Sequence, residues 1–491
     1  MDSKTSLSAS NLNLLPRSLA HQNGIEFALI QVSGERKLAV FADAELLESF
    51  DGEQSELQGR TLLIGPLSSR NASFLRNQFA WLKPKLLGLQ TSAGLGDRIG
   101  LATPGHVRAV RTTNGQIAPI FAQQSIREMT RTKRTPQQVI DDATWGVFAE
   151  GWESGFGADA DHLKTPEDID ACLSVGYTFF TIDPGAYVNN QAETASLDQL
   201  HDLANNLQND LQPPASGLLG SSFDFEGLKI VFDEYTLFKA AVKYGKAVEQ
   251  VARMYDHLAH SAGKQPFELE VSVDETEQPT THAEHVYIAH ELKRLGVKWV
   301  SLAPRYVGRF EKGVDYIGDI NAFEANIRGH AAIARQLGPY KLSLHSGSDK
   351  FSIYPAAMRQ TRGLVHLKTA GTSYLEALRT IAAIDSGFFR EVYVFARDHY
   401  ETDRISYHLS AELKYAPLPK SVSDWPGLLD QFDAREILHA TFGSVLTDRS
   451  FSDHHGLYNR LIELLQANPE AYAENLKKHF IRHLNSFLVK D

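Results

Sequence analysis

The chain has 491 residues, of which 43% are hydrophobic and 22% are charged, and its formal net charge is −11. This composition is typical of a globular protein with a large buried core. The acidic balance, together with the lack of Lys/Arg tracts interleaved with aromatic residues, excludes the usual basic nucleic-acid-binding protein.

The number of cysteines and the lengths of the apolar runs indicate the cellular compartment. Cys172 is the only cysteine, so the chain can form neither an internal disulfide nor a cysteine-based zinc site. Residues 1–18 lack the continuous apolar core of a signal peptide. No stretch approaches the ~20 apolar residues that span a bilayer. We therefore expect a cytoplasmic protein with no nucleic-acid or membrane partner; the sequence indicates no oligomeric state.

The first part of the chain differs in pattern from the rest. Residues 1–92 contain short alternating apolar segments and a helical stretch around 71–82. Alternation of apolar and polar residues is typical of half-buried strands. We expect a small N-terminal α+β elaboration here, with no chemistry of its own.

From about residue 95, short apolar runs recur, each ending in polar residues and most followed by a helical stretch. Such alternation predicts parallel βαβ units, and eight of them match a closed barrel. The predicted strands lie at 98–106, 155–164, 177–185, 267–276, 299–306, 340–349, 363–371 and 392–400. We therefore predict an α/β fold, a (β/α)8 TIM-type barrel, over residues 93–430.

Other segments are helical in pattern. Thr281 and Glu284 form a predicted capping box that opens a helix ending near Gly296. Residues 186–265 interrupt the strand–helix alternation and predict a helical insertion over the barrel mouth. Residues 431–491 have amphipathic spacing and predict a C-terminal helical segment.

In a barrel of this type, reactive groups gather at the C-terminal strand ends. Asp161 and His162 follow one predicted strand and could supply a base and a metal ligand together. Adjacent residues of a regular strand point to opposite faces, so both reach one site only if the chain bends there. The alternative interpretation is a solvated acidic loop.

A second predicted strand carries polar residues on one face. Glu270, Ser272 and Asp274 alternate along it. A carboxylate inside a barrel is costly unless it is paired or coordinated, which favours a functional role. The alternative is a reversed register that turns these side chains toward the surrounding helices.

Histidines end two further predicted strands, at His345 and His366. With His162 they make three strand-end imidazoles, although a single histidine is more often a satisfied core residue. Neutral imidazoles with a carboxylate suit a divalent cation such as Zn²⁺, Mn²⁺ or Co²⁺. The cations available to hold a substrate carboxylate are Lys164, Arg305 and Lys368.

Long motifs at these positions resemble the tagaturonate/fructuronate epimerase family of bacterial hexuronate catabolism. The resemblance runs from Gly94 to His408 through GLGDRIGLATPGH, GFGADADHLKT, FFTIDPGAYV, ELEVSVDETEQPTT, KLSLHSGSDKF, HLKTAGTSYLEALR and FARDHYETDRISYH. It implies an isomerase that interconverts the keto-hexuronates D-tagaturonate and D-fructuronate with a divalent metal cation. Zn, Mn, Co, Ni and Mg are not distinguished by the sequence.

The same resemblance implies residue roles. Asp161 would be the proton acceptor and Glu270 the proton donor, with His162 and His345 as metal ligands. His366 is our third ligand on strand position, with Asp274 or Glu275 as substitutes. Lys164, Asp274, Arg305 and Lys368 are assigned to binding of the small-molecule sugar acid.

The chemistry of the implied reaction favours breaking a carbon–carbon bond. The two sugar acids differ at C4, counted with the ketone at C2, and C4 is one bond too far from the ketone to lose its proton easily. We therefore expect a retro-aldol/aldol route. Oxidation by a nicotinamide is the alternative, but no Rossmann unit is present. Competing functions are a metal-dependent aldolase, an aldose–ketose isomerase, or a non-catalytic sugar-acid sensor.

Overall fold

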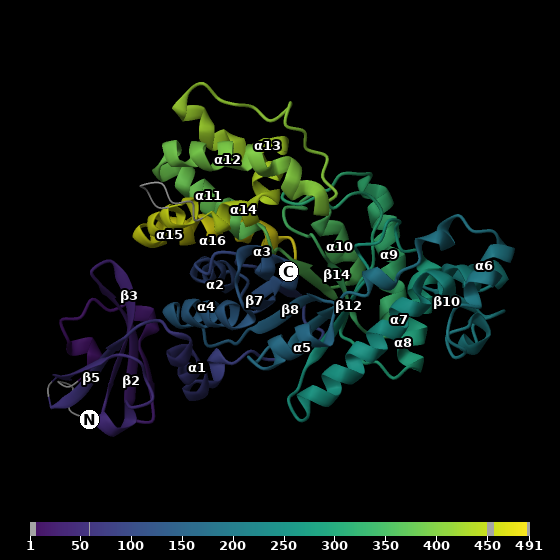
Figure 1. Ribbon diagram of the computed structural model, residues 1–491. Helices are drawn as coiled ribbons and strands as arrows, with labels where there is room; N and C mark the ends of the chain where they lie inside the picture. The colour runs from purple at the N-terminus through teal and green to yellow at the C-terminus, as the bar shows by residue number, and fades with distance from the viewer. Residues whose placement is uncertain (1–5, 58, 449–455, 489–491) are drawn as a thin grey trace.

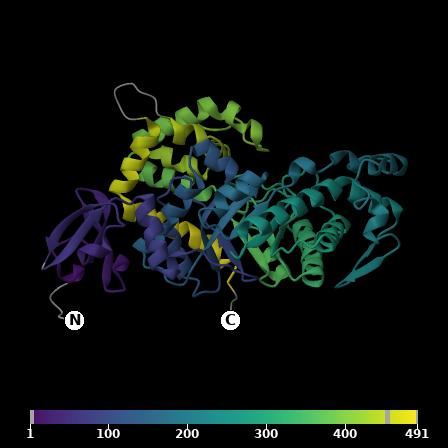
Figure 2. The same ribbon diagram turned by 60° about the horizontal axis from the view of Figure 1, so that its bottom comes forward.

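The computed structural model describes residues 6–57, 59–448 and 456–488. Its N-terminal part is a five-stranded antiparallel sheet in the order β1-β2-β3-β5-β4, followed by one helix. The elements are β1 (Ala20–Gln22), β2 (Ile25–Val32), β3 (Glu35–Ala42), β4 (Glu53–Leu57), β5 (Arg60–Gly65) and α1 (Ser69–Gln78). The sheet lies at one end of the molecule, beside the central barrel (Figures 1 and 2). The predicted α+β elaboration is therefore present.

Eight parallel strands close into a barrel, because β9 pairs with β12. The strands are β6 (Ser92–Gly94), β7 (Ala118–Ser125), β8 (Gly157–Leu163), β9 (Phe179–Ile182), β12 (Glu268–Ser272), β13 (Ser301–Ala303), β14 (Lys341–Leu344) and β15 (Val365–Lys368). They are buried almost throughout, as expected for parallel strands covered by helices. This confirms the predicted (β/α)8 barrel.

Two of the predicted strands are wrong, although the count of eight is correct. Residues 98–106 run into α2 (Thr103–Arg111), and residues 392–400 lie within α12 (Ser386–Asp403). The first two barrel strands are instead β6, of three residues, and β7, which is buried at every position. A strand that is buried on both faces, such as β7, shows no alternation of apolar and polar residues, so it gave no strand signal. In α12 the apolar residues follow a helical period, but over a short window this pattern cannot be distinguished from that of a strand.

A ring of helices covers the barrel, one after each strand. The ring consists of α2, α4 (Pro136–Ala149), α5 (Pro166–Leu173), α7 (Glu234–Ala262), α8 (His282–Arg294), α9 (Ile320–Leu337), α10 (Tyr354–Thr361) and α11 (Thr372–Ile384), with a short α3 (Ile126–Thr132) before α4. The predicted capping box of Thr281 and Glu284 is confirmed at the start of α8. Cys172 is buried on α5.

The range 186–265 comprises two different parts. The helix α7 packs against α5 and α8, so it belongs to the barrel ring rather than to an insertion. The excursion itself holds α6 (Leu197–Ala204) and the hairpin β10 (Ser222–Phe225)–β11 (Leu228–Val231), which extend to the side opposite the N-terminal sheet (Figure 1). No helix among the described residues is both long and apolar enough to cross a membrane.

Helices after the last barrel strand complete the molecule. They are α12, α13 (Phe432–Ala440), α14 (Phe442–Thr447), α15 (Leu457–Ala467) and α16 (Pro469–Asn485). α16 packs against both α2 and α11, the helices that follow the paired strands β6 and β15. The chain end thus covers the seam at which the first and last barrel strands meet.

The N-terminal unit is joined to the barrel by a buried ion pair. Arg76 Nη1 of α1 lies 2.7 Å from Asp141 Oδ1 of α4, and 2.8 Å from Thr144 Oγ1. Removing one member of a buried pair leaves an uncompensated charge, so we expect Arg76→Leu to lower the free energy of unfolding by ~3 kcal/mol in urea denaturation. The double variant Arg76→Leu/Asp141→Leu should recover most of this loss. A double variant no more stable than the single one would contradict the prediction.

Candidate functional site

The end of β8 supplies two adjacent side chains to one site. Asp159 and Asp161 alternate along the strand and both contact Lys368 inside the barrel. His162 has a φ of 55°, and the register with β9 shifts between Ala160 and Leu163. A positive φ is uncommon outside glycine, and here it turns His162 toward the same side as Asp161. This is the bend that the sequence required if both residues were to share a site.

Lys368 lies at the centre of the site. Its ammonium is 2.9 Å from Asp159, 2.7 Å from Asp161 and 2.8 Å from Glu270, and its side chain is 3% exposed. Burial lowers the pKa of Lys368, but the three carboxylates outweigh burial and raise it well above the usual value. Its donors are therefore directed to protein carboxylates, and Lys368 is poorly placed to hold a substrate carboxylate.

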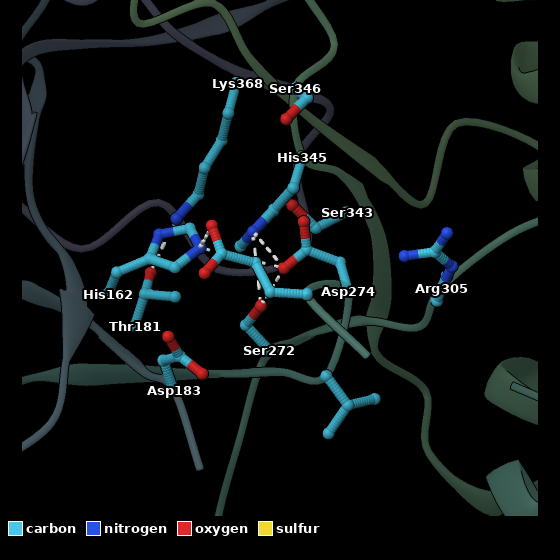
Figure 3. A network of polar contacts seen from close by, with 12 residues as sticks. His162, Thr181, Asp183, Ser272, Asp274, Arg305, Ser343, His345, Ser346 and Lys368 are labelled. Atoms are coloured by element: carbon cyan, nitrogen blue, oxygen red, sulfur yellow. Dashed lines mark hydrogen bonds and ion pairs between the residues drawn. The ribbon is translucent and has the colours of Figure 1, made fainter. Parts of the chain in front are cut away.

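His345 joins the second group of carboxylates. Its Nε2 lies 2.6 Å from Glu270 Oε1, and its Nδ1 lies 3.1 Å from Asp274 Oδ1. Figure 3 shows the His345 ring directed toward Ser272 and Asp274, with His162 on the other side of the network. Burial lowers the pKa of His345, whereas Asp274 and Glu270 raise it to about 9, with Lys368 opposing them. The sequence-predicted residues Asp161, His162, Glu270, Asp274 and His345 thus meet at the barrel mouth.

The donor set fits a divalent cation. Asp161, His162 and His345 offer three ligand atoms that all lie within 4.8 Å of one another. His162 Nε2 is buried without a hydrogen bond partner, although Asp274 Oδ1 lies 3.7 Å away. Imidazole with carboxylate suits Zn²⁺, Mn²⁺, Co²⁺ or Ni²⁺. A second possible group, His162 with Asp183 and Glu275, shares the same histidine.

His366 lies deeper in the barrel than these ligands. It is paired in register with Ser343, two residues before His345, and its Nδ1 lies 2.9 Å from Ser92 Oγ. Burial lowers the pKa of His366 to about 3. The structure therefore does not group His366 with His162 and His345. Same-face residues of a strand recur every ~6–7 Å, so sharing a face did not place His366 at the same depth.

The other predicted substrate-binding cations lie at the edge of the site. Lys164 is 3.3 Å from Asp183 and 56% exposed. Arg305 donates from Nη1 to the Thr276 carbonyl oxygen and lies apart from the dashed network in Figure 3.

Two adjoining cavities open at the mouth. The outer one has a volume of about 450 Å³, within the ~300–1,000 Å³ typical of small-molecule sites. The inner one has about 40 Å³, close to the ~30 Å³ share of one water, and is lined by Asp161, His162 and Lys368. Lys312, His345 and Ser346 line both. None of the described residues in 186–265 lines either cavity.

Several cavity residues were not predicted. Lys312 lies in the loop after β13, Tyr407 follows α12, and His439 comes from α13. No strand-end signal marks them, because they approach the mouth from loops and from helices outside the barrel ring. Asp159 could have been found, since it shares a strand face with Asp161.

Comparisons with known proteins agree with this architecture. The family model described as tagaturonate epimerase matches residues 15–487. A tagaturonate/fructuronate epimerase of Thermotoga maritima is 42% identical over 472 residues, which cover 96% of this chain and 95% of the relative. The crystal structure of a fructuronate-tagaturonate epimerase from Cohnella laeviribosi superposes with a TM-score of 0.91 at 36% identity, covering 98% and 97% of the two chains. A form of that protein with two glycerol molecules gives a TM-score of 0.92 at 36% identity, with 99% and 98% covered.

The role of Lys368 as counterion to the buried carboxylates can be tested by measuring the stability of a variant. Lys368→Met leaves three buried carboxylates without a counterion, so we expect the free energy of unfolding to fall by ~3–5 kcal/mol in urea at pH 7. The matched variant Lys164→Met alters an exposed lysine and should change it by less than ~0.5 kcal/mol. If Lys368 served only to contact substrate, both variants would unfold like the unaltered protein.

Proposed function

The chain belongs to the tagaturonate/fructuronate epimerase family, and from that premise we propose that it interconverts D-tagaturonate and D-fructuronate in a metal-dependent C4 epimerisation. The family is one of isomerases. The observation that carries the proposal is the meeting of a carboxylate, two imidazoles and a buried carboxylate–lysine cluster at a cavity of substrate size.

We assign the metal to His162 and His345 with a carboxylate oxygen of Asp161. Asp274 Oδ1, which lies 3.7 Å from His162 Nε2 and 3.1 Å from His345 Nδ1, is a further donor. A bound divalent cation supplies Lewis acidity for the substrate's ketone and neighbouring hydroxyl. A site made of imidazole and carboxylate ligands favours a transition metal over Mg²⁺. His366 is not included, because it lies one strand layer deeper.

The residues of the chain perform the proton transfers in this proposal. Burial raises the pKa of Asp161, but His162 and Lys368 outweigh it and hold the pKa well below the usual value, so Asp161 is ionised. Asp161 accepts the proton of the C4 hydroxyl as the C3–C4 bond breaks, which leaves an aldehyde at C4 and an enediolate over C2 and C3. The aldehyde rotates, the C3–C4 bond forms again on its other face, and the C4 alkoxide takes a proton.

Glu270 is the donor of that last proton in the proposal. Burial raises its pKa, whereas Lys368 and His345 lower it well below the usual value, so Glu270 needs a proton delivered during the reaction. Lys368 Nζ lies 2.7 Å from Asp161 and 2.8 Å from Glu270. This contact gives the proton accepted by Asp161 a hydrogen-bonded route to Glu270, so that one proton is taken up and one returned in each turnover.

Turnover is tested by NMR of the protein incubated with D-tagaturonate. We expect C4 inversion, and we expect Asp161→Asn to lower kcat by at least about 100-fold, because a general base contributes 10²–10⁴-fold. Asp159→Asn is the matched control: it removes a carboxylate from the same strand and the same lysine, but Asp159 transfers no proton in the proposal, so the loss of kcat should stay below about 10-fold. Cleavage products alone would indicate an aldolase, a shifted carbonyl an isomerase, and binding without turnover a sensor; each contradicts the proposal.

The ligand assignment is tested by calorimetric titration with Mn²⁺ or Zn²⁺. His345→Ala removes a proposed ligand, so we expect metal affinity to fall by more than about 100-fold, beyond the 10–100-fold effect of groups that only orient ligands. His366→Asn, a histidine of the same barrel in a deeper layer, should keep its affinity within severalfold. A fall of similar size in both variants would show that the third-ligand prediction from the sequence was correct.

A further inference from the structure

Lys312 is a mouth lysine whose ammonium contacts a hydroxyl rather than a carboxylate. Lys312 donates from Nζ to Ser346 Oγ at 2.6 Å, and it forms no ion pair with any carboxylate that the structure describes. Its side chain is partly enclosed and lines both the inner and the outer cavity. Glu275, Asp274 and Glu128 act on this ammonium without contacting it, and Arg127 opposes them. An enclosed ammonium with no direct ion pair favours an anionic ligand.

The neighbouring cations already have partners. Arg98 is paired with Glu128 at 2.5 Å and is 3% exposed, and Arg127 is paired with Glu275 at 2.8 Å. Lys368 contacts its three carboxylates. Arg305 has no ion pair among the described residues, but it lines only the outer cavity. Lys312 is therefore the cation next to the proposed ligand group that remains available.

The chemistry of the substrate also indicates that the cation that binds its carboxylate lies beside His345 rather than at the rim of the outer cavity. In a keto-hexuronate the carboxylate carbon is C6, only two bonds from the reacting C4. If C4 reacts at Asp161, the carboxylate must lie within a few ångströms of the inner cavity. Lys312 meets this condition through its contact with Ser346, the residue after His345.

His439 provides an uncharged partner next to Lys312. It is 1% exposed, lines the inner cavity, and its Nδ1 has no hydrogen bond partner. Burial, with Arg98 and Lys312 nearby, holds the pKa of His439 well below its usual value, so the ring is neutral. A Cβ on Gly371 would lie 1.8 Å from His439 Nε2, and one on Gly313 3.2 Å from Cδ2. These two glycines let the ring lie against the mouth loops.

We propose that Lys312 binds the carboxylate of the sugar acid and His439 the adjacent C5 hydroxyl, so that Lys312 sets the selectivity for keto-hexuronates over neutral ketohexoses. This inference rests on the proposed function, of which it names the substrate-recognition element. In this inference Lys312 takes the role that the sequence analysis gave to Lys164, Arg305 and Lys368.

The test measures binding in the Glu270→Gln background, which removes the proposed proton donor to suppress turnover and keeps the proposed metal ligands Asp161, His162 and His345. D-fructuronate and D-fructose, which has CH₂OH in place of the carboxylate, are titrated calorimetrically in the presence of Mn²⁺. We expect Lys312→Met to weaken fructuronate binding by roughly 100-fold or more and fructose binding by less than about threefold. His439→Ala should weaken both ligands to a similar extent, because both carry the C5 hydroxyl. Lys293→Met, which alters an exposed lysine of α8, should change neither.

The outcomes separate the two proposals. Equal weakening of both ligands by Lys312→Met, or retained preference for the acid, would overturn the carboxylate assignment even if the unaltered protein epimerises tagaturonate. Tight, Lys312-dependent binding of fructuronate by a protein that does not epimerise it would overturn the proposed function and leave the assignment standing. A thermal melt of each variant checks that it is folded.

Discussion

The barrel interior is organised by a buried ammonium shared among three carboxylates. Lys368 of β15 contacts Asp159 and Asp161 of β8 and Glu270 of β12, and it donates to Thr181 of β9 at 2.7 Å. Without this cation, three carboxylates could not remain ionised together in a dry lumen. The lysine thus connects four strands and allows acidic groups to gather where the lumen opens.

Loops anchored from outside the barrel hold the mouth side chains. Asp349 follows His345 by four residues and accepts from Arg435 at 3.0 Å and from His479 at 2.7 Å. Arg435 of α13 also donates to the Gly313 carbonyl oxygen, next to Lys312. One arginine thereby ties the loop of a proposed metal ligand to that of the proposed carboxylate site. The group Asp349, His479 and His483 has the spacing of a metal site, but these hydrogen bonds already use its polar atoms.

The two mouth cavities have different linings, which suit different steps of the proposed reaction. The inner one, of about 40 Å³, is surrounded by groups that accept or pass protons. The outer one, of about 450 Å³, is bounded by both cations and carboxylates of the barrel loops and by Tyr407 and His408, which follow α12. Loops that follow barrel strands therefore form most of the outer cavity, with a contribution from the segment after α12, while barrel strands carry the reacting groups.

Sequence alone determined the barrel and the presence of Asp161, His162, Glu270 and His345 at strand ends. The barrel follows from recurrent short apolar runs that end in polar residues, and the site follows from the cost of a carboxylate in a lumen. The sequence could not determine depth: His366 shares a face with Lys368 but lies a layer lower. Two strands were also assigned to the wrong residues. A strand buried on both faces shows no alternation of apolar and polar residues, and a short helical segment can resemble a strand. Only the tertiary structure decided that His162 turns inward at positive φ, that Lys368 is committed to protein carboxylates, and that Lys312 and His439 reach the mouth. Each of these depends on contacts between residues far apart in the chain, which no local pattern records.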